Sequence, residues 1–325
     1  MKIERLTDRF AILESVALWN DLHPDFALAE RLAIQNLYAP VPGVRVTAHG
    51  AFDNGNLVGA ILTKHLTDPV PGYPTPDVGW VSLFAVDSRV VDLPRVGTDL
   101  LSEALSDLRD RGVSTVSFGN DIQKFMPGLP ADLTPNYLPM LTDIGFRKTN
   151  DTSDLSVDIT TPRSREKVAK RLDDLGDVEF GRARSDEATA LQEFVASEFS
   201  GRWAYQVECT SRVPGGVDDY WVARREDDIV AFARTGTTDS AVFSSCVNWV
   251  ERYGPAYCGL GPIGVAEDAR GDGIGLDLIA TVMAEFRDQG YQHMTIDGVT
   301  QRLEGYYLRL GFEPRLRFQM LTNEF

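Results

Sequence analysis

The sequence predicts an α/β protein that carries one domain twice, and two observations lead to this prediction. Landmarks recur at a constant offset of 178 residues, since 97–101 matches 275–279 and 110–112 matches 288–290. Both halves also show the same order of strand and helix signals. A fixed internal offset is typical of a repeated structural unit. Several matches in one order favour two copies of a fold over chance.

In the first copy, we expect helices near 9–20 and 27–38, followed by strands at 44–52 and 57–66. The residues between these strands, Asp53-Asn54-Gly55-Asn56, are those of a tight hairpin turn. A buried strand at 81–86 and a helix at 97–108 complete the pattern. These alternating elements predict a sheet covered by helices.

The second copy repeats the hairpin with strands at 220–224 and 229–235, then a buried strand at 261–265 and a helix from 275 onward. A Gly-Phe pair closes each half, at 145–146 and at 311–312. Their smaller offset indicates an insertion in the first copy near 125–130. We therefore expect a first domain over 1–160, a charged linker helix over 161–176 and a second domain over 177–325.

Composition narrows the class of protein. The 325 residues carry 32 basic against 48 acidic side chains, a net charge of -16, which disfavours nucleic acid and anionic membranes as partners. No apolar run suits a membrane helix or a signal peptide, so the cytoplasm is the expected location. The spacing of the three cysteines suits neither a metal site nor a disulfide framework, and no metal is expected.

The candidate binding site is the turn Arg270-Gly271-Asp272-Gly273-Ile274-Gly275, which lies between the expected strand at 261–265 and the following helix. Glycines there let the backbone approach a phosphate, and the free amides of a helix N-terminus can hold it. Alone, such a turn is more often just a tight loop. A dinucleotide fingerprint is excluded because the last glycine interval is too short.

Here the sequence resembles the GNAT superfamily of acyl-CoA-dependent N-acyltransferases, whose pyrophosphate loop reads Gln/Arg-x-x-Gly-x-Gly/Ala. The resemblance extends to the preceding segment 265–269, although Glu267 replaces the usual proline, and to the downstream Tyr307-x-x-x-Gly311-Phe312. It implies two tandem GNAT-like α/β (α+β) domains, each with a mixed, mostly antiparallel central sheet flanked by helices.

The resemblance also implies roles for the coenzyme-binding residues. The backbone around Ile263, Gly264 and Val265 would bind the pantetheine arm of acetyl-CoA as an added strand, and the amides of Gly271 to Gly275 would hold its pyrophosphate. The family's asparagine seven residues before the tyrosine is replaced by Thr300, which can still donate a hydrogen bond.

For catalysis, the resemblance implies direct attack by an amine, with Tyr307 protonating the leaving thiolate and a strand amide near Val265 stabilising the oxyanion. The family's usual glutamate base falls near Gly259, where no acid stands. Asp297 is the first candidate base, followed by Glu208 and Glu251, and a water relay is an alternative. A covalent mechanism through Cys258 is disfavoured because no histidine has a recognisable pairing with it.

The first copy has lost these features. Aligned on Gly97 with Gly275, the place of Gly273 is taken by Arg95 and that of Arg270 by Asp92. Leu141 stands where the tyrosine would be. The first copy is therefore expected to be noncatalytic, with its insertion near 125–130 as a candidate wall of the acceptor pocket.

The expected function is thus an N-acyltransferase (EC 2.3.1.-), most simply an acetyltransferase. It would act on a primary amine of a small molecule, an amino sugar or a peptide. The rival hypothesis is a noncatalytic acyl-CoA sensor or scaffold. The chain is expected to be a monomer or a homodimer.

Overall fold

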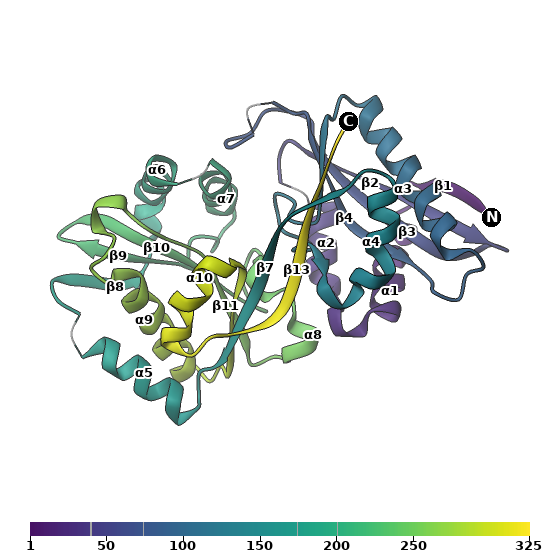
Figure 1. Ribbon diagram of the computed structural model, residues 1–325. Coiled ribbons are helices and arrows are strands. Elements are labelled where there is room, and N and C mark those ends of the chain that lie inside the picture. The colour runs from purple at the N-terminus through teal and green to yellow at the C-terminus, as the bar shows by residue number, and fades with distance from the viewer. Residues whose placement is uncertain (40, 74, 174, 200) are drawn as a thin grey trace. The chain divides into compact units, whose positions relative to one another are not determined.

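The computed structural model describes residues 1–39, 41–73, 75–173, 175–199 and 201–325. The chain folds into two compact units (Figure 1). Unit 1 comprises Met1–Thr152 together with Arg317–Phe325, and unit 2 comprises Ser153–Leu316. This division differs from the expected boundaries, because the last residues of the chain belong with its first half.

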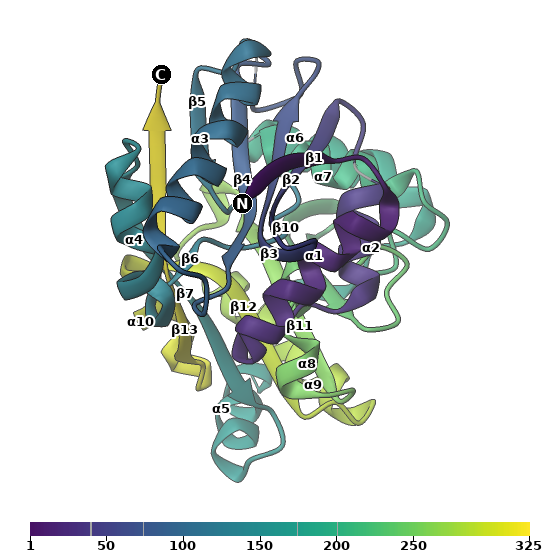
Figure 2. The ribbon, with the colours of Figure 1, turned by 90° about the vertical axis from the view of Figure 1, so that its right-hand side faces the viewer.

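Unit 1 contains a sheet in the order β1-β2-β3-β4-β5-β13. Among the described residues, β4 and β5 pair in parallel, and the neighbours β1–β2, β2–β3, β3–β4 and β5–β13 are antiparallel. Figure 2 shows α1 and α2 on one side of these strands, with α3 and α4 on the other. The elements in chain order are β1 (Lys2–Leu6), α1 (Arg9–Leu22), α2 (Glu30–Tyr38), β2 (Val44–Asp53), β3 (Asn56–Leu66), β4 (Val78–Val86), α3 (Leu93–Asp110), β5 (Thr115–Phe118), β6 (Leu129–Pro130), α4 (Thr134–Asp143) and β7 (Arg147–Asp158).

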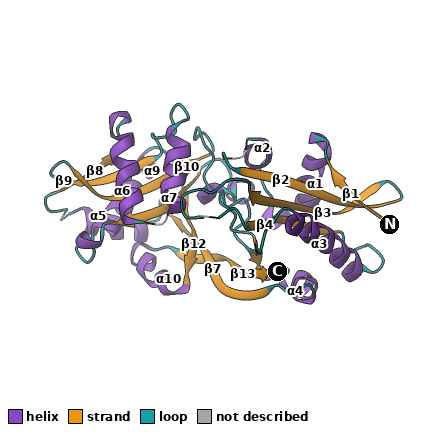
Figure 3. Ribbon diagram, turned by 90° about the horizontal axis from the view of Figure 1, so that it is seen from above, coloured by secondary structure: helices purple, strands orange, loops and turns teal. Residues whose placement is uncertain are grey.

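Unit 2 repeats this plan in the order β8-β9-β10-β11-β12-β7, where β11 pairs with β12 in parallel and the neighbours from β8 to β11 are antiparallel. Helices α6 and α7 cover one face of its sheet and α9 the other (Figures 1 and 3). The elements are α5 (Pro162–Leu172), β8 (Val178–Arg182), α6 (Ala188–Glu198), α7 (Gly201–Ser211), β9 (Tyr220–Arg225), β10 (Asp228–Thr237), α8 (Val250–Tyr253), β11 (Tyr257–Val265), α9 (Ile274–Asp288), β12 (His293–Thr300), α10 (Gln301–Tyr307) and β13 (Glu313–Glu324). Both sheets confirm the expected mixed, mostly antiparallel fold class.

Two strands are shared between the units. Strand β7 begins in unit 1 and from Ser153 onward belongs to unit 2, where it lies beside β12. Strand β13 begins in unit 2 and from Arg317 onward belongs to unit 1, where Leu321 pairs with Phe118 of β5. Each half of the chain therefore supplies a strand to the unit built mainly from the other half.

The local signals form as expected where they depend on neighbouring residues. The hairpin between β2 and β3 turns at Asn54 and Gly55, both with positive φ, as its sequence requires. Helix α9 buries Ile274, Leu278 and Val282 against the sheet of unit 2. This apolar stripe repeats every three to four residues, so burial of one helix face positions the turn that precedes it.

The expected linker helix is a packed element of unit 2. Helix α5 begins after Thr161, whose side chain accepts the amide of Ser164 at 3.2 Å, and Val168 lies in the same hydrophobic core as α9. Position 174 of the expected linker lies outside the described residues. Among the described helices, none is both long enough and apolar enough to span a membrane.

Candidate active site

The candidate site lies where the two parallel strands of unit 2 separate. Strands β11 and β12 pair from Tyr257 with His293 up to Leu260 with Ile296. Both strands continue, but no further pairing between them occurs in the described residues. The next residues, Gly261 and Asp297, therefore stand at the point of separation. On its other side, β11 shifts register against β10 at this same place.

Gly261 allows a close approach between the separating strands. A Cβ atom at this position would lie 2.5 Å from Oδ1 of Asp297, a contact that side chains do not tolerate. The other carboxylate oxygen of Asp297 accepts a hydrogen bond from the hydroxyl of Ser245 at 2.9 Å. Asp297 is thereby held at the apex of the opening.

Beyond the apex, β11 presents backbone groups on its open edge. The amide of Ala266 donates to the carbonyl of Val230 at 2.9 Å, so residues 264 and 266 face β10. Since strand residues alternate, the amides and carbonyls of Ile263 and Val265 face away from β10. The carbonyl of Val265 accordingly accepts Nε of Arg270 at 3.1 Å. This edge has the polarity that an added strand-like ligand requires.

The glycine turn ends at the N-terminus of α9, as the sequence predicts. Gly273 caps the helix with φ +87°, a conformation that side chains disfavour. Its carbonyl accepts the amides of Leu276 and Asp277 at 2.9 and 3.2 Å. In the described part of the chain, the amides from Gly271 to Gly275 have no protein acceptor. The turn therefore offers consecutive donors of the kind that bind anions.

Two arginines lie against the turn. Arg171 of α5 donates through Nε to Oδ1 of Asp277 at 2.6 Å and through Nη2 to the carbonyl of Gly273 at 3.2 Å. Arg225 of β9 pairs with Asp272 at 3.0 Å, and both of these side chains are exposed. The carboxylates beside the turn are thus paired with cations.

Tyr307 ends helix α10 and is 9% exposed. Burial, and next the neighbouring Tyr306 and the charge of Asp297, raise the pKa of the Tyr307 phenol above its usual value. The charge of Asp297 is thus felt at the Tyr307 phenol. Its hydroxyl has no hydrogen-bond partner among the described residues, so it is available to a ligand.

Tyr306 and Thr300 both belong to the α10 segment, Thr300 as its N-cap and Tyr306 near its end. The hydroxyl of Tyr306 would be 2.5 Å from a Cβ atom at Gly275, and burial raises its pKa to about 12. Thr300 caps α10 through its backbone, and its side chain makes no capping hydrogen bond. The hydroxyl of Thr300 is therefore not committed to the helix that it precedes.

Sequence reasoning missed the residues that hold Asp297. Asp154 of β7 is buried; its carboxylate accepts the indole of Trp249 at 2.7 Å and the amide of Gly298 at 2.8 Å. It therefore anchors both the residue after Asp297 and the segment that carries Ser245. No local pattern singles out Asp154, because its partners lie more than 90 residues away in sequence.

The other candidate bases and the candidate nucleophile lie in surroundings that suit catalysis less. Glu208 forms an ion pair with Arg212 one helical turn away, and Glu251 is exposed on the short helix α8. Burial raises the pKa of the Cys258 thiol well above its usual value, and the thiol donates to the carbonyl of His293 at 3.4 Å. A protonated, buried thiol is a poor nucleophile.

The corresponding region of unit 1 is filled by its own side chains. Strands β4 and β5 pair up to Val81 with Phe118, and the next residue on β4 is Ser82. Its hydroxyl donates to Asp121 at 2.7 Å, and Asp121 pairs with the fully buried Lys64 at 3.1 Å. This polar cluster occupies the place where unit 2 opens.

The insertion near 125–130 and the turn before α3 also depart from unit 2. Phe125 and Met126 are buried in unit 1, so they are core residues and not an exposed pocket wall. The helix α3 is capped by Asp92 with positive φ and begins with Leu93 and Pro94. Since proline has no amide hydrogen, this turn offers fewer donors than its counterpart.

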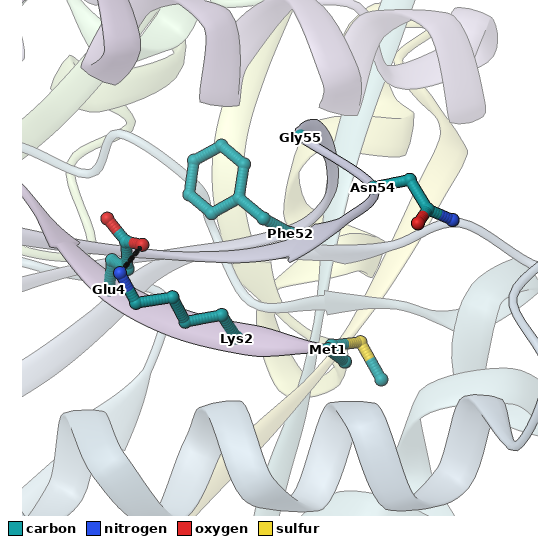
Figure 4. Close-up of a pocket in the computed structure, with 6 residues that line it drawn as sticks. All are labelled: Met1, Lys2, Glu4, Phe52, Asn54 and Gly55. Carbon is teal, nitrogen blue, oxygen red and sulfur yellow. Dashed lines mark ion pairs between the residues drawn. The ribbon is translucent and has the colours of Figure 1, made fainter.

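A hollow in unit 1 lies beside β1 and the hairpin between β2 and β3 (Figure 4). Its charged lining residues are Lys2 and Glu4, which pair with each other at the surface. The lining residues are Met1, Lys2, Glu4, Phe52, Asn54 and Gly55. This lining offers no uncommitted charged group for catalysis.

Comparisons with known proteins show which family and which folds the chain resembles. Residues 217–314 match the acetyltransferase (GNAT) domain family. A GCN5-related glucosamine N-acetyltransferase region in a fungal multidomain GH3 β-N-acetylglucosaminidase superposes with a TM-score of 0.82 at 22% identity, over 99% of this chain and 38% of that one. The chain therefore spans well under half of the length of that multidomain protein. No curated protein sequence matches the chain.

Two further structures align over nearly the whole length of both chains. A tandem GNAT protein from the clavulanic acid biosynthesis pathway has a TM-score of 0.69 at 16% identity, covering 99% of this chain and 98% of that one. A GCN5-related N-acetyltransferase from Sphaerobacter thermophilus has a TM-score of 0.68 at 16% identity, covering 99% and 95%. Residues 217–314, which lie within unit 2, thus match the acetyltransferase (GNAT) domain family, and the chain as a whole has the fold of tandem GNAT proteins.

Proposed function

We propose that the chain is an N-acetyltransferase that transfers an acetyl group from acetyl-CoA to a primary amine. The observation that carries this proposal is the opening between β11 and β12, with Asp297 at its apex and Tyr307 beside it. The anion-binding turn at Gly273 follows β11 directly. These features suit a thioester whose diphosphate lies on the turn and whose acyl end reaches the apex.

In this proposal, the pantetheine arm bonds to the open edge at Ile263 and Val265. The amine nitrogen attacks the thioester carbonyl carbon, and a backbone amide on the open edge of β11 stabilises the oxyanion. As the carbon–nitrogen bond forms, the excess proton of the amine passes to Asp297 directly or through water. The carbon–sulfur bond then breaks, and Tyr307 protonates the departing thiolate. Since burial raises the pKa of Tyr307, the phenol holds its proton at neutral pH.

The test is release of CoA thiol from acetyl-CoA across a library of primary amines. Glucosamine comes first because the similar fungal structure is described as a glucosamine N-acetyltransferase region. Acceptor-dependent thiol release is expected, and Tyr307→Phe should lower kcat by about 10²-fold or more. Tyr306→Phe is the matched control and should affect kcat less. Full activity of Tyr307→Phe would remove the proposed acid.

Coenzyme binding is tested separately by calorimetry with acetyl-CoA on the wild type and Gly273→Trp. A side chain at Gly273 is strained by the positive φ, and its Cβ would lie 2.6 Å from Nη2 of Arg171. Equal binding by both proteins would refute the proposed diphosphate position. Binding by the wild type without turnover on any amine would favour the rival function, a noncatalytic acyl-CoA sensor.

A further inference from the structure

Helix α5, the expected linker helix, carries Arg171, whose guanidinium lies beside the glycine turn. Its position is fixed independently of the turn, because Val168 is buried in the core of unit 2 and Lys167 donates to the carbonyl of Leu308 at 2.8 Å. Arg171 lies three residues after Val168 and four after Lys167, so it is on the same face of the helix as both. The guanidinium is therefore held at the turn by a packed helix.

The partner of Arg171 is a largely buried carboxylate. Asp277 lies in the first turn of α9, and its side chain is 8% exposed. A buried carboxylate needs a compensating charge, and this one stands close to the amides that would face a diphosphate. Without Arg171, the negative charge of Asp277 would oppose the binding of an anion at the turn.

Arg171 also contacts the turn itself. Nη2 donates to the carbonyl of Gly273, the residue with positive φ that caps α9. The Arg171 side chain remains 35% exposed, so the guanidinium is not enclosed by its two partners. One side chain thus neutralises the carboxylate and fixes the backbone of the anion-binding turn.

We propose that Arg171 is a positioning residue of the coenzyme site, which prepares the turn for a diphosphate by neutralising Asp277 and holding Gly273. This inference rests on the proposed function, since it assumes that the turn receives the diphosphate of an acyl-CoA. It assigns part of the site to a helix outside the matched domain, which begins at residue 217.

The experiment measures binding of acetyl-CoA and of acetyl-pantetheine, which lacks the diphosphate, to Arg171→Gln, Arg171→Lys and the control Lys170→Gln. Lys170 is exposed on the same helix, so its change removes an equal charge away from the turn. Arg171→Gln should weaken acetyl-CoA binding about ten- to a hundredfold and leave acetyl-pantetheine binding unchanged. Arg171→Lys should fall between the wild type and Arg171→Gln, and Lys170→Gln should bind as the wild type does.

The double variant Arg171→Gln/Asp277→Asn tests neutralisation directly. It removes both charges, so it folds without a buried unpaired carboxylate and should recover part of the lost affinity. A double variant no better than Arg171→Gln, or an Arg171→Gln protein that binds acetyl-CoA within twofold of the wild type, would overturn the proposal. A wild type that binds no acetyl-CoA would instead refute the proposed function. If Arg171→Gln does not fold, the proposal is tested with the double variant and Arg171→Lys. Wild-type affinity for acetyl-CoA in both of these proteins would overturn it.

Discussion

The carboxylate of Asp154 accepts the indole N–H of Trp249 at 2.7 Å, and both side chains are almost fully buried. The second oxygen of the carboxylate accepts the amide of Gly298. The pair therefore connects β7, the segment before α8 and the end of β12, three parts of unit 2 that are distant in sequence.

Asp154→Ala removes the carboxylate that accepts both of these hydrogen bonds. We expect the free energy of unfolding to fall by about 2–4 kcal/mol, and Trp249→Phe, which removes one donor and part of the buried indole, to cost about 1–2 kcal/mol. Urea denaturation followed by circular dichroism measures both. An Asp154→Ala protein as stable as Trp249→Phe would contradict the anchoring role.

The ion pair between Glu187 and Arg224 predicts a stability change at acidic pH. Two hydrogen bonds of 2.6 and 2.7 Å from the guanidinium lower the pKa of Glu187 from 4.5 to about 2. Because the folded pKa is depressed, the stabilisation is fully present above about pH 4.5 and is lost as pH falls towards 2. Denaturant titrations between pH 6 and 2 should show a smaller loss of stability in Glu187→Gln than in the wild type. Parallel curves would disprove the assignment.

The thiols are predicted to differ in reactivity. Burial raises the pKa of Cys246 to about 12 and that of Cys258 well above its usual value, so both remain protonated and covered. Cys209 is half-buried, and burial raises its pKa as well. A thiol-specific reagent at pH 8 should therefore modify Cys209 slowly and the other two after unfolding in urea. Rapid modification of Cys258 in the native protein would reopen a covalent mechanism.

The cluster in unit 1 is predicted to be structural. Lys64 and Asp121 are fully buried, and Lys64 also donates to Asn36 at 2.9 Å. Lys64→Met strands the carboxylate of Asp121 and should cost about 3–5 kcal/mol of stability. Lys64→Met/Asp121→Asn should cost less, because no buried charge is left unpaired. Thermal unfolding of the three proteins measures this order, and a double variant less stable than Lys64→Met would contradict it.

The sequence predicted the elements of the candidate site that depend on near neighbours. The turn at Gly273 follows from glycines between an apolar strand and an amphipathic helix, whereas Tyr307 was a candidate only through the resemblance of its segment to the family's Tyr-x-x-x-Gly-Phe. Such signals lie within a few residues of the structures that they specify. The repeat also predicted two similar sheets, and the strand orders agree with it.

Contacts between distant segments were not predictable in this way. Ser245 and Asp154 approach Asp297 and Gly298 across 52 and 144 residues of sequence. Arg171 meets Asp277 across 106 residues, and the charge of α5 is equally typical of a solvated helix. The shared strands were missed for a similar reason, because a strand's sequence favours pairing without naming its partner.

The placement of β13 affects how the protein folds during synthesis and how it responds to truncation. Its last residues lie at the end of the second half of the sequence, yet Leu321 lies in the hydrophobic core of unit 1 and Asn323 donates to the carbonyl of Ile144 at 2.9 Å. Removing these residues would leave β5 with an unpaired edge, which invites association with other chains. Since synthesis proceeds from the N-terminus, unit 1 cannot complete its sheet until residues 317–325 have been synthesised. The two halves should therefore fold cooperatively. Fragments cut near residue 160 should regain structure only when they are mixed.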